Sequence, residues 1–171
     1  MSLKIFCDIA DYRIIKKFNK LKIVKGFTTN PSLMRASGAK NYKQYSLKIL
    51  KICKTKPISF EVFSDDIEGM IQQAHKIKSW GKNVYVKIPV VNSKGKFTGR
   101  AIKELSSNNV KLNITAVYTY EQVKKIVKVL NKKSKTIISI FAGRMADVGK
   151  DPVPIFKKSI NLTKKYRNIE I

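Results

Sequence analysis

The hexapeptide Val84-Tyr85-Val86-Lys87-Ile88-Pro89 governs the architecture that we predict for this chain of 171 residues. Apart from Lys87, its side chains are apolar or aromatic on successive residues, which is typical of a strand covered on both faces. Sheets of that kind consist of parallel strands that are connected by helices. The hexapeptide therefore predicts an α/β fold.

The sequence on both sides of this strand repeats a unit of one strand and one amphipathic helix. We predict strands over residues 3–8, 22–28, 58–63, 84–89, 111–117 and 136–141, and helices over 11–20, 42–53, 66–80, 98–107, 120–130 and 152–166. Residues 168–171 resemble the start of a seventh strand. The alternation fits an open doubly wound sheet and a (β/α)₈ barrel alike. No Gly-x-Gly-x-x-Gly follows the first strand, so a dinucleotide-binding fold gains no support.

The chain carries a net charge of +25 but also 43% hydrophobic residues, which is enough apolar material for a folded core. Only 5 of its 36 basic residues are arginines, the residue type that base and phosphate recognition favours. The basic residues are also spread along the whole chain. We therefore interpret the charge as a solvated lysine-rich surface and expect no specific nucleic-acid partner, with a polyanion-binding protein as an alternative.

The sequence has no pattern typical of a membrane span, a signal peptide or a cysteine-based site. No stretch approaches the roughly 18 apolar residues of a membrane span, and residues 1–8 lack the apolar run of a signal peptide. Cys7 and Cys53 lie far apart without metal-ligand spacing, so neither a disulfide framework nor a metal site is predicted. We expect a cytoplasmic protein with reduced thiols and no membrane partner.

Polar residues stand at the end of each predicted strand. In a (β/α)₈ barrel the carboxyl ends of the strands carry the functional groups. The candidates at these positions are Asp8, Thr28, Thr29, Asn30, Glu61, Lys87, Asn113, Thr115, Ser139 and Arg144.

Lys87 is the sharpest of these candidates because it lies within an apolar strand. Burial of an ammonium group favours its neutral form, and a neutral amine can attack a carbonyl to form a Schiff base. Glu61 lies between apolar residues of the neighbouring predicted strand, where pairing with Lys87 would offset its burial. With Asp8, the set offers one nucleophile and two carboxylates for proton transfer. The alternatives are a lysine that reaches solvent and an ion-pair network without catalysis.

Four segments together resemble the transaldolase family, in order and at compatible spacing from Ile5 to the last residue. They are Gly26-Phe27-Thr28-Thr29-Asn30-Pro31-Ser32, Val86-Lys87-Ile88-Pro89, Asn113-Ile114-Thr115-Ala116-Val117-Tyr118 and Ser139-Ile140-Phe141-Ala142-Gly143-Arg144-Met145-Ala146-Asp147. The resemblance is greatest to the small single-barrel transaldolases and the fructose-6-phosphate aldolases. It implies a (β/α)₈ TIM barrel of the class I aldolase type. Residues 1–171 would form one incomplete domain, with about six βα units and the start of strand 7.

The resemblance also implies a mechanism that uses neither a metal nor an organic cofactor. Lys87 would form a Schiff base with a sugar phosphate and transfer a dihydroxyacetone unit, as in the pentose phosphate pathway. The resemblance assigns proton exchange to Asp8 and a catalytic water to Glu61 and Thr115. It assigns substrate binding to Thr28, Asn30, Asn113, Ser139, Phe141 and Arg144, with the Arg144 guanidinium suited to a phosphate.

Two residues favour transfer over simple aldol cleavage. Relatives that act as aldolases tend to carry Gln at the position of Glu61 and Tyr at the position of Phe141. The family's barrel continues through strands 7 and 8, so we expect either a fragment of a longer protein or a truncated barrel. A truncated barrel would need partner chains or be inactive. By analogy with small relatives we also expect a homo-oligomer.

Overall fold

The computed structural model describes residues 4–171, and seven parallel strands form one sheet in them. The strands are β1 (Ile5–Asp8), β2 (Val24–Thr28), β3 (Ile58–Glu61), β4 (Val84–Pro89), β5 (Leu112–Val117), β6 (Thr136–Ile140) and β7 (Ile169–Glu170). They are hydrogen-bonded in the order of the sequence, from β1 to β7. A doubly wound sheet reverses its strand order at a switch point, so this uninterrupted order excludes that alternative.

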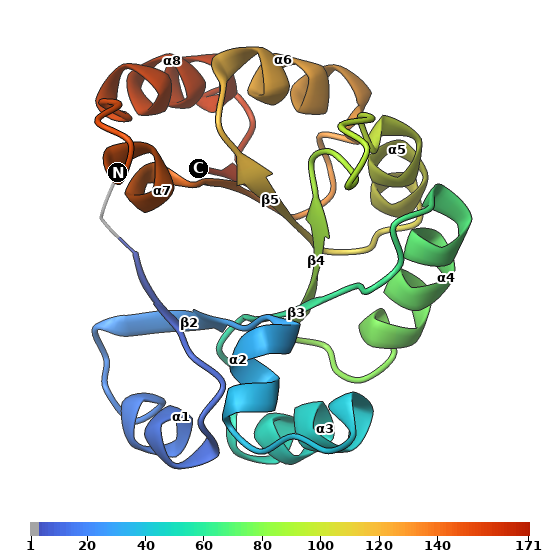
Figure 1. The fold of residues 1–171 in the computed structure, drawn as a ribbon, viewed down its shortest axis with the longest axis vertical. Helices are drawn as coiled ribbons and strands as arrows, with labels where there is room; N and C mark the ends of the chain where they lie inside the picture. The colour runs from blue at the N-terminus through green and yellow to red at the C-terminus, as the bar shows by residue number, and fades with distance from the viewer. Residues whose placement is uncertain (1–3) are drawn as a thin grey trace.

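The helices are α1 (Tyr12–Phe18), α2 (Pro31–Ala36), α3 (Tyr42–Ile52), α4 (Ile67–Lys78), α5 (Gly99–Ser107), α6 (Tyr120–Val129), α7 (Ala142–Ala146) and α8 (Val153–Thr163). Figure 1 shows the sheet curled on itself, with α1, α3, α4, α5, α6 and α8 around its outer face and an open side between β1 and the carboxyl end. The molecule is thus a partial (β/α) barrel. None of the helices between residues 4 and 171 is both long and apolar enough to cross a membrane.

Apolar residues fill the layer between the sheet and the outer helices. Ile15, Ile49, Ala74 and Ile102 are completely buried on α1, α3, α4 and α5. Phe6 of β1 instead belongs to the lining of a cavity within the curl, and it lies over Gly26 of β2. A Cβ atom at Gly26 would lie 2.2 Å from the Phe6 ring, so only glycine leaves room for that ring.

The predicted alternation of strands and helices is confirmed, with differences at several boundaries. Residue 3 of the first predicted strand lies outside the described residues. β3 ends at Glu61 rather than at residue 63, because the backbone N–H groups of Phe63 and Ser64 donate to the Gln73 side chain instead of to a strand. The short helices α2 and α7 were not predicted. α2 has clear start signals, since the Asn30 side chain accepts a hydrogen bond from the Leu33 N–H and Pro31 is its first residue.

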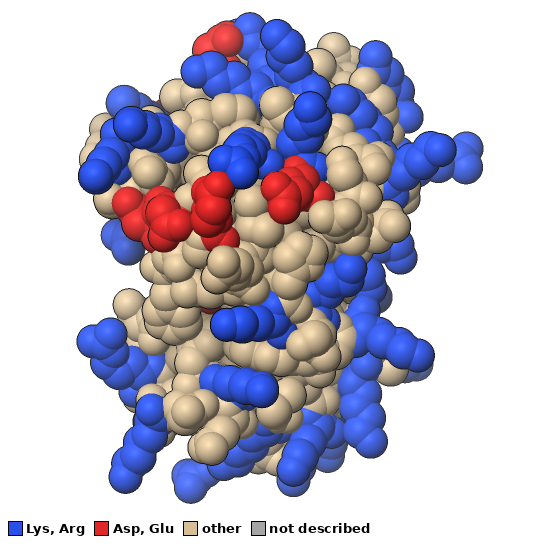
Figure 2. Space-filling view, turned by 90° about the vertical axis from the view of Figure 1, so that its right-hand side faces the viewer, with Lys and Arg blue, Asp and Glu red and all other residues tan. Residues whose placement is uncertain are grey.

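Basic side chains are spread over the whole face shown in Figure 2, whereas most of the acidic residues in this view gather in its upper half. This distribution matches the even spread of lysines along the sequence. Five ion pairs join residues of the described chain, and three of them are between well-exposed partners on or next to helices: Arg100–Glu68, Lys124–Glu121 and Arg144–Asp147. Such exposed pairs contribute little to stability, so the surface charge is mainly solvated.

Candidate active site

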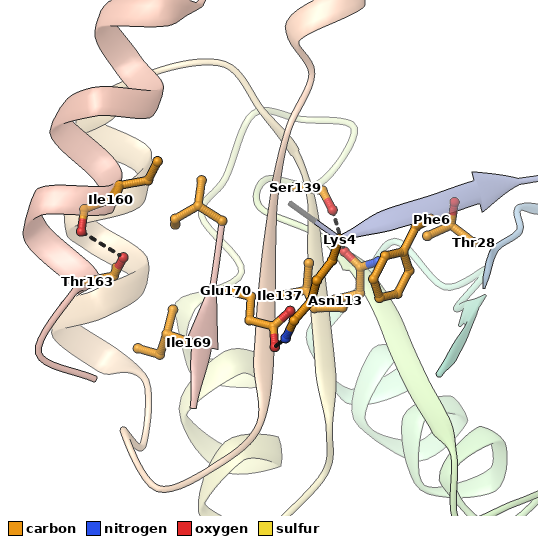
Figure 3. Close-up of a pocket in the computed structure, with 11 residues that line it drawn as sticks. Lys4, Phe6, Thr28, Asn113, Ile137, Ser139, Ile160, Thr163, Ile169 and Glu170 are labelled. Carbon is orange, nitrogen blue, oxygen red and sulfur yellow. Dashed lines mark hydrogen bonds and ion pairs between the residues drawn. The ribbon is translucent and has the colours of Figure 1, made fainter. Parts of the chain in front are cut away.

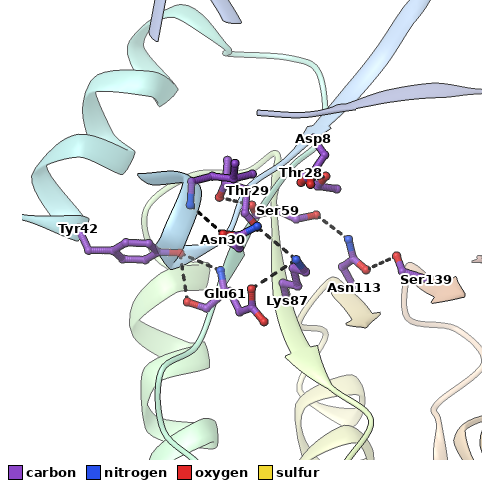
Figure 4. Close-up of polar contacts among 11 residues, drawn as sticks. Asp8, Thr28, Thr29, Asn30, Tyr42, Ser59, Glu61, Lys87, Asn113 and Ser139 are labelled. Atoms are coloured by element: carbon purple, nitrogen blue, oxygen red, sulfur yellow. Dashed lines mark hydrogen bonds and ion pairs between the residues drawn. The ribbon is translucent and has the colours of Figure 1, made fainter. Parts of the chain in front are cut away.

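The strand register places Glu61, Lys87 and Asn113 side by side. Glu61 of β3 is the register partner of Lys87 of β4, which is in turn the partner of Asn113 of β5. Register partners in a parallel sheet point to the same face. On that face the three polar side chains lie together inside the curl (Figure 4). The prediction that Glu61 and Lys87 are neighbours on adjacent strands is therefore confirmed.

Lys87 and Glu61 form a largely buried ion pair. Nζ of Lys87 lies 3.3 Å from Oε2 of Glu61, and the two side chains are 10% and 20% exposed. Nζ also lies 3.4 Å from the carbonyl oxygen of Thr29. Burial raises the pKa of the Glu61 carboxyl, while the neighbouring Lys87 ammonium opposes that rise and Asp8 adds to it. The alternative of a lysine that extends into solvent is excluded for Lys87.

Asp8 and Thr28 form a second polar pair at the ends of β1 and β2. The Thr28 hydroxyl donates a 2.7 Å hydrogen bond to the Asp8 carboxylate. Asp8 is itself exposed, whereas Thr28 is half-buried. The negative charge of Asp8 also contributes to the raised pKa of Glu61.

A chain of three polar side chains crosses the curl from β3 to β6. The Asn113 amide donates to Oγ of Ser59 at 3.0 Å, and the Ser139 hydroxyl donates to Oδ1 of Asn113 at 2.8 Å. These bonds fix the orientation of the Asn113 amide, which is almost completely buried. Sequence reasoning missed Ser59, although its spacing of two residues from Glu61 places both on one face of β3.

Thr115 presents a buried hydroxyl that is unpaired within residues 4–171. Its Oγ1 atom has no hydrogen-bond partner among those residues. The neighbouring Ala116 has a φ of +58°, and the register of β5 against β6 shifts between Ile114 and Val117. Such irregularities redirect side chains at functional sites. A buried hydroxyl without a partner is costly, so Thr115 is suited to bind a water molecule or a substrate hydroxyl.

The remaining predicted residues lie at the edge of this cluster or outside it. The Asn30 side chain caps α2. Phe141 contacts Tyr118 edge to face, with ring centroids 5.6 Å apart. Arg144 lies on α7 with its side chain 75% exposed and pairs with Asp147 at 3.8 Å. Arg144 therefore takes no part in the buried contacts around Lys87.

A cavity of about 470 Å³ adjoins the cluster where the curl is open, between β1 and β7 (Figure 3). Thr28, Asn113 and Ser139 supply polar groups to its lining, and Ile137 and Ile169 supply apolar ones. A 2.6 Å ion pair between Lys4 and Glu170 also lies at this cavity. The cavity touches the Asn113 end of the polar cluster, whereas Glu61 and Lys87 lie outside its lining.

Comparison with known proteins gives a consistent result. A family model described as transaldolase/fructose-6-phosphate aldolase matches residues 5–171. A probable transaldolase of Nitrosopumilus maritimus is 34% identical over 168 residues, which are 98% of this chain and 71% of that protein. A probable transaldolase of Thermoplasma volcanium is 36% identical over 166 residues, which are 96% of this chain and 70% of that protein.

The chain also has a weak likeness to a solved structure. It is an N-acetylneuraminate lyase from Mycoplasma synoviae, with a TM-score of 0.45 and 11% identity. The match covers 96% of this chain and 67% of that one.

Proposed function

The chain belongs to the transaldolase/fructose-6-phosphate aldolase family, and from this membership we propose that it transfers a dihydroxyacetone unit between sugar phosphates through a Schiff base on Lys87. The observation that carries the proposal is the buried Lys87 amine, which lies within a barrel strand and 3.3 Å from the Glu61 carboxylate. Sugar-phosphate substrates, a homo-oligomer and a cytoplasmic location belong to the same proposal and rest on the family alone.

The first step forms the imine. Lys87 reacts as a neutral amine, and Glu61 is close enough to accept the ammonium proton. The raised pKa of Glu61 makes its carboxylate a better proton acceptor. The amine adds to the C2 carbonyl of a ketose phosphate, and the carbinolamine then loses water to become an iminium ion. Glu61 and the unpaired hydroxyl of Thr115 are suited to hold that water molecule.

Cleavage and transfer follow from the electron-withdrawing iminium group. The C3–C4 bond breaks, its electron pair moves into the iminium group to give an enamine, and the C4 hydroxyl proton passes to Asp8. The C4 fragment leaves as an aldehyde. The enamine carbon then adds to the carbonyl carbon of a second aldehyde, and Asp8 returns the proton to the oxygen that becomes the new hydroxyl. Water finally hydrolyses the imine, which releases the product and restores the Lys87 amine.

Binding roles follow from the surrounding groups. Asn113, oriented by Ser59 and Ser139, is suited to bind a substrate hydroxyl. Arg144 is the exposed guanidinium that we assign to the phosphate. Asn30 and Phe141 complete the proposed binding surface. We favour transfer over cleavage because the residue beside Lys87 is Glu61 and the residue after β6 is Phe141, where aldolase-type relatives tend to carry Gln and Tyr.

Product analysis tests this proposal directly. The protein is incubated with fructose 6-phosphate, with and without erythrose 4-phosphate. We expect sedoheptulose 7-phosphate only when the acceptor is present, and no product from Lys87→Met. Lys25→Met, the same change at an exposed position of β2, serves as the matched control and should retain activity. Release of free dihydroxyacetone without an acceptor would support the aldolase alternative, and no product under either condition would refute both.

A further inference from the structure

Tyr42, the first residue of α3, holds the backbone of Glu61 with both functions of its hydroxyl group. The hydroxyl oxygen accepts a hydrogen bond from the backbone N–H of Glu61 at 2.8 Å, and the hydroxyl O–H donates one to the carbonyl oxygen of the same residue at 3.1 Å (Figure 4). Neither the helix position of Tyr42 nor any sequence motif predicts this contact. Tyr42 contacts Glu61 but is not among the residues that the proposed mechanism uses.

The sheet geometry explains why Glu61 needs such a partner. On its β4 side, the strand continues its ladder, because the Val62 N–H donates to the Lys87 carbonyl at 3.1 Å. On the β2 side the pairing ends at Thr28 and Ser59, because Asn30 already caps the start of α2. The N–H and C=O groups of Glu61 therefore face a gap in the ladder. Buried backbone groups require partners, and the Tyr42 hydroxyl supplies both.

We propose that Tyr42 is a positioning residue for Glu61: by replacing the missing strand, it holds Glu61 where its carboxylate meets the Lys87 amine. This inference rests on the function proposed above, in which Glu61 serves imine formation and hydrolysis. The tyrosine acts through Glu61 and does not touch the reacting atoms.

The surroundings of Tyr42 fit a fixed positioning group. Its ring meets Phe60, Phe63 and Trp80 at centroid distances of 6.5, 4.7 and 6.0 Å, and the contacts with the two phenylalanines are edge to face. These aromatic contacts restrict the ring to one orientation. Burial also raises the pKa of the Tyr42 phenol, so the hydroxyl retains the proton that it donates to Glu61.

The chain offers a matched control three residues along the same helix. Tyr45 is also half-buried, and its hydroxyl lies 3.2 Å from the backbone carbonyls of Ala10 and Ser37, away from Glu61. Tyr42→Phe and Tyr45→Phe therefore each remove one hydroxyl group that is hydrogen-bonded to the backbone. Only the first change releases Glu61.

The test measures how fast borohydride captures the imine at saturating fructose 6-phosphate, together with kcat and KM. For Tyr42→Phe we expect a capture rate and kcat about tenfold lower with KM almost unchanged, because an unpaired N–H lets Glu61 move. We also expect the limb of the pH profile that reports Glu61 to move. For Tyr45→Phe the rates should stay within about twofold of the parent chain. In a Glu61→Gln background, Tyr42→Phe should give no further slowing.

Each result of this test either supports or overturns the positioning role of Tyr42. Equal rates in the two phenylalanine variants, or a full additional loss in the Glu61→Gln background, would overturn the positioning role. If Tyr42→Phe does not fold by circular dichroism, Tyr42→His takes its place. Its ring can still offer a hydrogen bond, so a capture rate between those of the parent and Glu61→Gln is expected, and a rate equal to the parent's would overturn the inference. No adduct in the parent chain would refute the proposed function itself, and the inference would fall with it.

Discussion

Lys87→Met should destabilise the protein in a pH-dependent manner, because it leaves the Glu61 carboxylate buried without its partner. Removing one member of a buried ion pair costs about 3–5 kcal/mol. The Glu61 side chain keeps 20% of its surface exposed, which places the expected loss at the lower end, about 3 kcal/mol at pH 7.5. With a urea dependence of about 2 kcal/mol per M, the unfolding midpoint should fall by about 1.5 M.

The sign of the pH dependence follows from the pKa of Glu61. Burial already raises this pKa in the folded protein, and Lys87 opposes the rise, so Lys87→Met raises it further. The unfolded chain keeps a value near 4.5. A carboxyl whose pKa is higher in the folded state costs stability above that folded pKa and none below the unfolded one. The deficit of Lys87→Met should therefore be larger at pH 7.5 than at lower pH, and it should shrink as the pH falls towards 4.5.

Urea titrations followed by circular dichroism at pH 7.5, 6 and 5 measure this dependence. The double variant Lys87→Met/Glu61→Gln removes both charges and should recover most of the lost stability. Lys25→Met, at an exposed position of β2, should change the midpoint little at any pH. A deficit that is independent of pH, or a double variant as unstable as the single one, would refute the account of a coupled buried pair.

Three further expectations concern the fold. Gly26→Ala should lower the free energy of unfolding by about 1–3 kcal/mol in urea titrations, because its Cβ would lie 2.2 Å from the Phe6 ring; an unchanged midpoint would contradict this packing. Ala116→Gly should be neutral or stabilising by up to about 1 kcal/mol, because the residue has a φ of +58°; a clear loss of stability would contradict the strained geometry. Burial raises the pKa of the Cys53 thiol to about 11, so at pH 8 a thiol reagent should modify the partly exposed Cys7 first and Cys53 only after unfolding; equal rates would count against the buried position.

The sequence reveals most of the barrel because its strands and helices each carry a periodic apolar pattern. It also predicts the meeting of Glu61 and Lys87, since a buried carboxylate and a buried amine on adjacent strands stabilise each other. The alternation of strands and helices does not determine the order of the strands in the sheet, because an open doubly wound sheet would show the same alternation. It follows only from the three-dimensional arrangement of β1 to β7.

The features that sequence reasoning missed depend on where the regular pattern stops. Tyr42 reaches Glu61 because β2 ends early and leaves a gap in the ladder. Ala116 takes a left-handed conformation at a shift in register between β5 and β6. Neither a missing ladder partner nor a local bulge leaves a periodic signal, so both remain hidden until the strands are aligned. Asn30 illustrates a further ambiguity, because one side chain can be a helix cap and a candidate for substrate binding.

Mapping of the borohydride-reduced adduct tests the central claim most directly. The protein is incubated with fructose 6-phosphate, reduced with borohydride, digested and analysed by mass spectrometry. The chain has many exposed lysines, so the position of the adduct is informative. The account predicts a single three-carbon adduct, located on Lys87 and absent from Lys87→Met. No adduct, or an adduct that persists on other lysines in Lys87→Met, would contradict it.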